Sequence, residues 1–87
     1  GEMPEDVTEQ TDNIFKIALA VLEGQGLNWS DVVRHRVFVT DGEYIGKIAQ
    51  ALKSRFENCP PANTTLICGI PAPGAKVEIE FTARLRE

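Results

Sequence analysis

Residues 77–85 read V-E-I-E-F-T-A-R-L, and apolar and polar side chains alternate through this stretch without a break. Strict alternation is typical of a β-strand that buries one face and exposes the other, because successive side chains point to opposite faces of a sheet. The buried face needs a cover, and the apolar stripe of an amphipathic helix is the usual one. We therefore expect the rest of the chain to supply helices and further strands.

Two amphipathic helices are predicted. The first begins near residues 6–9, D-V-T-E, which have the spacing of a capping box, and ends at the glycines of residues 24–26. Its expected apolar stripe consists of Ile14, Ile17, Ala18, Val21 and Leu22. Gln10 and the other polar residues are expected to face mostly away from this stripe. The second helix follows Asp41-Gly42, stops before Pro60-Pro61 and has an apolar stripe made of Ile45, Ile48, Ala49, Leu52 and Phe56.

Two further extended segments complete the predicted fold. Residues 32–40 are rich in β-branched side chains, which favour a strand. Alternation along this strand places Arg34 and Arg36 on one face. The opposite face has Val33, His35, Val37 and Val39. Residues 64–70 follow the prolines, and a turn at residues 71–74 leads into the alternating strand. A right-handed crossover from 32–40 to 64–70 places both helices on one face of the sheet. We expect an α+β two-layer sandwich in the order α-β-α-β-β, with the order of the strands in the sheet left open.

Length and composition favour a single small globular domain over residues 1–87. The 87 residues have a mass of 9.6 kDa, and 43% of them are hydrophobic and 25% charged. A chain of this size buries only about 60–65% of its unfolded surface, so association with further subunits is expected. The uncovered face of a thin sheet would be buried between those subunits.

Charge and hydropathy argue against two classes of partner. The formal net charge of −4 has the wrong sign for binding the phosphate backbone of a nucleic acid, so nucleic-acid binding is not expected. The most apolar stretch, residues 14–22, contains Lys16 and is far shorter than the roughly 20 residues that cross a bilayer. We find no leader pattern before it and expect a cytoplasmic protein that does not bind membranes.

The cysteines and the histidine are interpreted mainly as structural residues. Cys59 and Cys68 match neither a disulfide framework nor the ligand spacing of a zinc site, so free thiols and no metal are expected. Cys68 shares parity with Leu66 and Ile70 and is interpreted as a small core residue, whereas Cys59 lies in a loop. His35 shares its predicted face with three valines and is expected to be packed. In the loop after the first helix, Trp29 is expected to pack as a lid.

An ordered set of short motifs runs almost from end to end of the chain. In sequence order these are D-V-x-x-Q-T at 6–11, L-x-x-x-G at 22–26, D-V-V with V-F-V-T-D within 31–41, P-A at 61–62, and K-V-E-I-E at 76–80. With this set the chain resembles the RidA (YjgF) family of reactive intermediate deaminases. The resemblance implies a chorismate-mutase-like fold and a homotrimer with small-molecule clefts between its subunits. It also implies hydrolysis of imines and enamines such as 2-aminoacrylate to 2-oxo acids and ammonia, without a metal or organic cofactor.

The chain departs from the family pattern in ways that bear on its activity. Family members begin with a β-hairpin that supplies part of the cleft, and we expect the domain over 1–87 to lack it. The family arginine that binds the substrate carboxylate after the Pro-Ala pair is replaced by Asn63. Because a neutral amide binds an anion more weakly than arginine does, we expect about 5- to 150-fold weaker carboxylate binding. Ala49 and Leu52 stand where many members have Asn and Tyr, which makes the expected cleft less polar.

The resemblance also assigns candidate site residues. Glu78 matches the family carboxylate that positions a water molecule or carries a proton. Its alternative role is in a structural charge network on one strand face, together with Lys76, Glu80, Thr82 and Arg84. Asn63 and the backbone amides of Thr64 and Thr65 are the candidate substrate-binding groups, and the alternative for Asn63 is a turn residue at the start of a strand.

Two functions of different classes remain open. The first is a cofactor-independent imine or enamine deaminase, in which Glu78 orients water and Asn63, Thr64 and Thr65 hold the substrate. The second is a non-catalytic small-molecule-binding or interaction protein that has lost the carboxylate-binding arginine. The RNase or translation-inhibitor label attached to some relatives is disfavoured, because the chain is acidic and lacks a basic aromatic surface.

Overall fold

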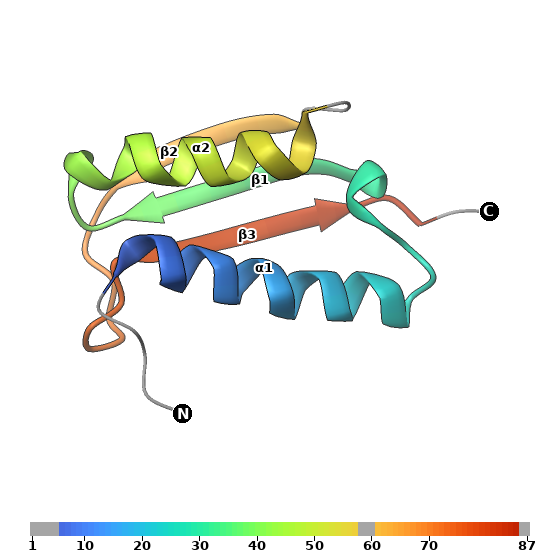
Figure 1. The fold of residues 1–87 in the computed structure, drawn as a ribbon, viewed down its shortest axis with the longest axis horizontal. Helices are drawn as coiled ribbons and strands as arrows, with labels where there is room; N and C mark the ends of the chain where they lie inside the picture. Colours follow the sequence, from blue (N-terminus) through green and yellow to red (C-terminus); the bar gives the residue numbers. More distant parts are fainter. Residues whose placement is uncertain (1–5, 58–60, 86–87) are drawn as a thin grey trace.

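The elements follow the chain in the predicted order. The computed structural model describes residues 6–57 and 61–85. They form helix α1 (Val7–Gly24), strand β1 (Val32–Val39), helix α2 (Ile45–Phe56), strand β2 (Ala62–Ile67) and strand β3 (Val77–Ala83). Short 3-10 turns, Trp29–Asp31 and Gly42–Tyr44, precede β1 and α2. Both helices lie on the same side of the sheet (Figure 1), which confirms the predicted α+β two-layer sandwich.

The local sequence explains where α1 begins and ends. Asp6 is the N-cap residue, and its carboxylate accepts a hydrogen bond from the backbone N–H of Thr8 at 3.1 Å. This bond satisfies one of the amides that the first turn leaves without a helical partner. Gly26, just beyond the C-cap, has a φ of +73°, a conformation that glycine adopts without strain. The helix therefore ends in the glycine segment, as predicted.

The sheet has the strand order β2-β1-β3, with β1 parallel to β2 and antiparallel to β3. The turn at 71–74 is thus not a hairpin, because β1 lies between the two strands that it connects. In the parallel pair, Asn63 lies beside His35 and Thr65 beside Val37. β2 ends at Ile67 rather than at the predicted residue 70, because its partner strand ends at Val39.

The buried face of α1 differs from the predicted stripe. Its inward-facing residues are Val7, Gln10, Thr11, Phe15 and Leu22. Ile17 is 67% exposed and Val21 is also exposed, so the prediction was wrong for these two residues. The helix is oriented by Phe15, whose ring packs edge-on against Trp29 at 5.6 Å between centroids and lies 5.9 Å from the ring of Phe81. An aromatic ring buries more apolar area than Ile or Val, so burying Phe15 outweighs burying them. The packing role predicted for Trp29 is confirmed.

Gln10 is buried, although the sequence placed it on the polar face of the helix. It is 4% exposed, and its Nε2 donates to the carbonyl of Gly74 at 2.9 Å. Its Oε1 accepts a hydrogen bond from the backbone N–H of Lys76 at 2.8 Å. A polar side chain can be buried when its donors and acceptors are matched in this way. Gln10 therefore fastens the first turns of α1 to the segment that leads into β3.

A β-bulge near the start of β1 corrects the predicted parity. The pairing of β1 with β3 is irregular between Val32 and Arg34, and Val32 is buried while Val33 is 40% exposed. An inserted residue reverses the alternation on one side of the bulge. The predicted face is therefore wrong for Val33 and confirmed for His35, Val37 and Val39, which are all buried.

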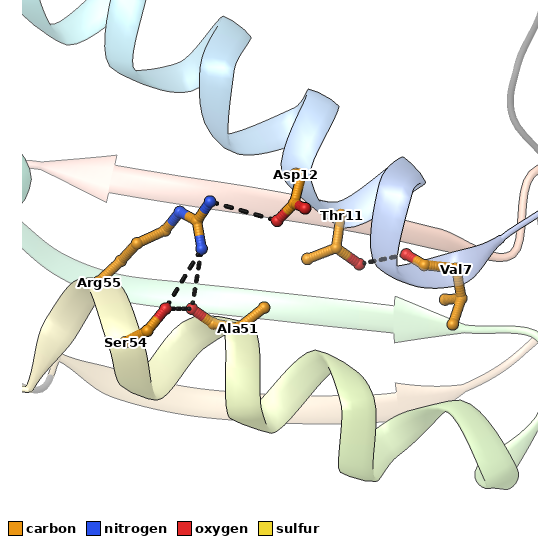
Figure 2. A network of polar contacts seen from close by, with 6 residues as sticks. All are labelled: Val7, Thr11, Asp12, Ala51, Ser54 and Arg55. Carbon is orange, nitrogen blue, oxygen red and sulfur yellow. Dashed lines mark hydrogen bonds and ion pairs between the residues drawn. The ribbon is translucent and has the colours of Figure 1, made fainter.

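Arg55, near the end of α2, links the two helices (Figure 2). Its Nη2 donates to Oδ1 of Asp12 on α1 at 3.2 Å, and its Nη1 donates to the carbonyl of Ala51 and the hydroxyl of Ser54, each at 3.3 Å. The guanidinium also lies over the Phe15 ring, 4.3 Å from its centroid, where a cation is attracted by the ring face. These contacts fix α2 against α1 and hence its position over the sheet. Within the described ranges, neither helix combines the length and the apolar character needed to cross a membrane.

Candidate functional site

An open cleft lies between α2 and the edge strand β2. Its volume is about 300 Å³, and its described walls are His35, Ala49, Leu52, Lys53, Phe56, Glu57, Pro61 and Asn63. A smaller hollow of about 90 Å³ shares Ala49, Leu52 and Asn63 with the cleft and extends along β2 to Thr65. Together they form one candidate site, called here the α2/β2 cleft.

The cleft exists because α2 turns its large apolar side chains toward the middle of the sheet. Ile48, Leu52 and Phe56 recur every fourth residue and are buried, as predicted. Ala49 and Ile45, which were predicted in the same stripe, are instead exposed on the side of the helix that faces β2. A small alanine opposite the short side chains of β2 leaves the space between helix and edge strand unfilled.

The polar groups of the cleft carry no net charge among its described residues. Lys53 and Glu57 are exposed and have opposite charges. Asn63 contributes a neutral amide, and its Nδ2 donates to the hydroxyl of Thr65 at 3.3 Å. Because β2 is an edge strand, alternate backbone amides along it face away from the sheet and have no partner in it. The cleft therefore offers neutral hydrogen-bonding groups beside an apolar wall.

His35 forms the deepest polar part of this wall. It is 4% exposed, and its imidazole stacks on the Phe56 ring with 5.4 Å between the centroids and 26° between the planes. The Phe81 ring of β3 lies 6.4 Å away on the same side of the sheet. Desolvation by these neighbours holds the pKa of His35 below its ordinary value of 6.5, so the ring is neutral at pH 7. Its Nδ1 is buried without a hydrogen-bond partner among the described residues.

The sequence predicted that His35 would be packed, and the structure confirms this. The sequence did not assign His35 to a ligand site. The structure adds that His35 lines the cleft beside Asn63, its register partner on β2. That pairing depends on the register of two strands far apart in the sequence. The only signal available in advance was a titratable side chain on an otherwise apolar strand face.

The predicted site residues do not gather at one place in a single chain. Asn63 and Thr65 line the α2/β2 cleft, whereas Thr64 has Arg36 as its register partner and lies on the open face of the sheet. Glu78 also lies on that open face, exposed, opposite Phe38. Asn63 and Glu78 are therefore on opposite faces of the sheet.

The open face carries part of the predicted charge network. Arg36 Nη2 lies 3.0 and 3.1 Å from the two carboxylate oxygens of Glu80, and both side chains are about half exposed. Within residues 6–57 and 61–85, Glu78 forms no ion pair. Lys76, which was predicted in this network, extends its Nζ over the Tyr44 ring, 5.7 Å from the centroid.

Cys68 does not line the α2/β2 cleft. Cys68 is exposed, so its interpretation as a core residue is wrong; it follows Ile67, the last residue of the edge strand β2. Cys59 lies outside the described residues. In the parts of the chain that the structure describes, no group of three or more His, Cys, Asp or Glu side chains is arranged to hold a metal ion.

Comparisons with known proteins identify a family and a relative. The family model described as endoribonuclease L-PSP matches residues 1–85. Protein DfrA of Myxococcus xanthus is 33% identical over 78 residues, which cover 90% of this chain and 60% of that protein. The chain thus spans less than two thirds of the length of this relative.

Solved structures show the same fold. The YjgF gene product of E. coli is 28% identical with a TM-score of 0.89, over 99% of this chain and 70% of that one. A YjgF family member from Mycobacterium tuberculosis is also 28% identical with a TM-score of 0.89, over 94% of this chain and 70% of that one. The arrangement of two helices on a mixed three-stranded sheet is therefore a known one.

Proposed function

Since the chain belongs to the endoribonuclease L-PSP family, which is the YjgF or RidA family, we propose that it binds a small molecule in the α2/β2 cleft. The observation that carries this proposal is the position of Asn63. The resemblance places it where the family has its ligand-binding arginine, and it lines a cleft of about 300 Å³. A cleft of this size suits a small organic ligand.

The proposed reaction is the hydrolysis of an imine or enamine. Water adds to the imine carbon, the carbon–nitrogen bond of the resulting adduct breaks, and a carbonyl compound and ammonia are released. No electrons are gained or lost, so the reaction needs no redox cofactor. A carboxylate such as Glu78 would accept a proton from the attacking water and return one to the leaving nitrogen. Asn63 and outward-facing amides of β2 would hold the substrate.

A site that uses both Asn63 and Glu78 needs more than one subunit. Asn63 and Glu78 lie on opposite faces of the sheet, so a site that uses both must take each from a different chain. The open face also carries apolar surface, since Leu66, the register partner of Phe38, is 47% exposed. We therefore propose a homotrimer in which open faces are buried against one another and the clefts are completed by neighbouring subunits.

A second candidate is a binding protein without catalytic activity. It is favoured by the neutral Asn63 and by the opposite charges of Lys53 and Glu57, which give the described cleft no net positive charge for a carboxylate. RNA cleavage is not proposed, because the net charge of −4 opposes the approach of a phosphate backbone.

An activity assay separates the two candidates. Freshly generated 2-aminoacrylate is supplied to the protein, and its loss is followed by semicarbazone trapping together with ammonia release. We expect a weak rate above buffer for the wild type and an increase of about 5- to 150-fold in kcat/KM for Asn63→Arg. Gln50→Arg is the matched control, because it adds the same charge at an exposed residue of α2 that does not line the cleft. A rate no greater than buffer in all three proteins would remove the deaminase and leave the binding protein.

A further inference from the structure

His35 is the one buried polar side chain in the described wall of the α2/β2 cleft, and the proposed hydrolysis gives it no role. The residue is only 4% exposed, and its Nδ1 has no hydrogen-bond partner among the described residues. Nδ1 itself has almost no accessible surface, so a ligand in the cleft would reach the other ring nitrogen, Nε2, which also has no hydrogen-bond partner among the described residues. The imidazole also stacks on Phe56, which fixes the ring plane relative to the cleft.

From this arrangement we propose that the cleft takes an uncharged, flat ligand and that His35 determines this specificity by hydrogen bonding to the ligand's polar group. The inference rests on the proposed function of the cleft as a ligand site. It deepens that function by naming an uncharged imine or amide-like molecule as the ligand class that the cleft prefers over a carboxylate.

The charges around the cleft support an uncharged ligand. α2 contributes Lys53 and Glu57 at the exposed rim, and β2 contributes only the neutral Asn63 and Thr65. β3 presents Phe81 to the imidazole, while its Glu78 and Glu80 project from the other face of the sheet. A carboxylate transferred from water into this site would lose its hydration and would face the neutral imidazole and no net positive charge. Its binding is therefore disfavoured.

The apolar part of the wall supports a flat ligand. Leu52, Phe56 and Pro61 line the cleft beside Ala49, whose single methyl group leaves the space between helix and strand open. A planar group fits between a helix and an edge strand with large contact area and few rotatable bonds to immobilise. Its polar end would then lie beside His35 and Asn63, which are register partners.

Two probes of the same shape and different charge test the proposal. Benzamide and benzoate have the same ring and the same number of heavy atoms, but benzamide is neutral and benzoate is an anion at pH 7.5. Each is titrated into ¹⁵N-labelled protein, and the imidazole nitrogens are followed by NMR; His35 is the only histidine, so their signals need no assignment. We expect benzamide to shift the His35 ring signals and to bind about tenfold or more tightly than benzoate.

Two variants separate hydrogen bonding from packing. His35→Phe keeps an aromatic ring against Phe56 but removes both nitrogens, and it should lose the preference for benzamide, observed on the backbone amides of residues 49 and 63. His35→Gln places an amide near the position of Nε2 and should retain more of the preference than His35→Phe does. The wild-type titration alone decides the case if either variant fails to fold.

Several outcomes would overturn the inference. These are equal binding of the two probes, tighter binding of benzoate, benzamide shifts confined to α1 or to the open face, and no shift with benzamide up to its solubility limit. The failure of the inference and the failure of the proposed reaction are distinguishable. Hydrolysis of 2-aminoacrylate without benzamide binding removes only the inference, and benzamide binding without hydrolysis removes only the reaction.

Discussion

Replacing Gln10 with alanine should lower the free energy of unfolding by about 2–3 kcal/mol. The side chain is 4% exposed, donates a hydrogen bond to the Gly74 carbonyl at 2.9 Å and accepts one from the Lys76 amide at 2.8 Å. Two such bonds contribute about 1 kcal/mol each, and a part-buried amide of Lys76 left without its acceptor adds about 1 kcal/mol more. The loss is large for one residue because both polar ends of a buried amide are matched, by groups more than 60 positions away in the chain.

Urea unfolding at a fixed protein concentration measures this loss, with an unchanged m-value showing that the same surface is exposed. Gln50→Ala is the matched control, since Gln50 is an exposed residue of α2 and the change in helix propensity is the same. It should alter the free energy of unfolding by no more than about 0.5 kcal/mol. If Gln10→Ala is no more destabilising than Gln50→Ala, the reasoning about the buried amide is refuted.

Gln10→Glu adds a test of the direction of each bond. The ionised carboxylate of this variant would still accept from the Lys76 amide but would oppose the Gly74 carbonyl, to which only a donor can bind. The variant should be at least as unstable as Gln10→Ala at pH 7 and recover part of the loss as the carboxyl is protonated at lower pH. A stability of Gln10→Glu equal to that of the wild type at pH 7 would contradict the donor role of Nε2.

Two further predictions concern the core and the histidine. Phe15→Ala should cost about 3–5 kcal/mol in thermal or urea unfolding, whereas Ile17→Ala should cost under about 1 kcal/mol; similar losses would mean that α1 buries the stripe expected from the sequence. Burial lowers the pKa of His35, so the unfolded state binds a proton more readily than the folded state does. The contribution of neutral His35 to the free energy of unfolding should therefore be fully present above pH 6.5. It should be lost as the pH falls from 6.5 toward the lower pKa of the folded state. His35→Phe should flatten this part of the stability profile, and an unchanged slope in the variant would show that other groups cause it.

The sequence predicted the elements of the fold well because their patterns are local. The alternation through 77–83 and the four-residue spacing of Ile48, Leu52 and Phe56 depend only on neighbours along the chain. The same reasoning failed at Gln10, since periodicity assigns polar residues to the surface and does not detect a matched donor and acceptor elsewhere in the chain. It also failed at Val33, because an inserted residue in a strand leaves no local signal.

The candidate site was predictable only in part for the same reason. The motif after Pro61 identified Asn63, and Asn63 does line a cleft. Which face of the sheet it shares with His35, and which face Glu78 occupies, depend on the strand order and the register. Neither was determined by the sequence pattern, since a hairpin and a strand order with β1 in the centre have the same local signals.

The opposite placement of Asn63 and Glu78 makes self-association the central claim of this account. Size-exclusion chromatography with multi-angle light scattering on the 87-residue chain tests it most directly. A trimer of 9.6 kDa subunits predicts a mass of about 29 kDa, with the open faces of the sheets buried between chains. A single species of 9.6 kDa at micromolar concentration would contradict the claim, because no second chain would then bring a carboxylate to the cleft.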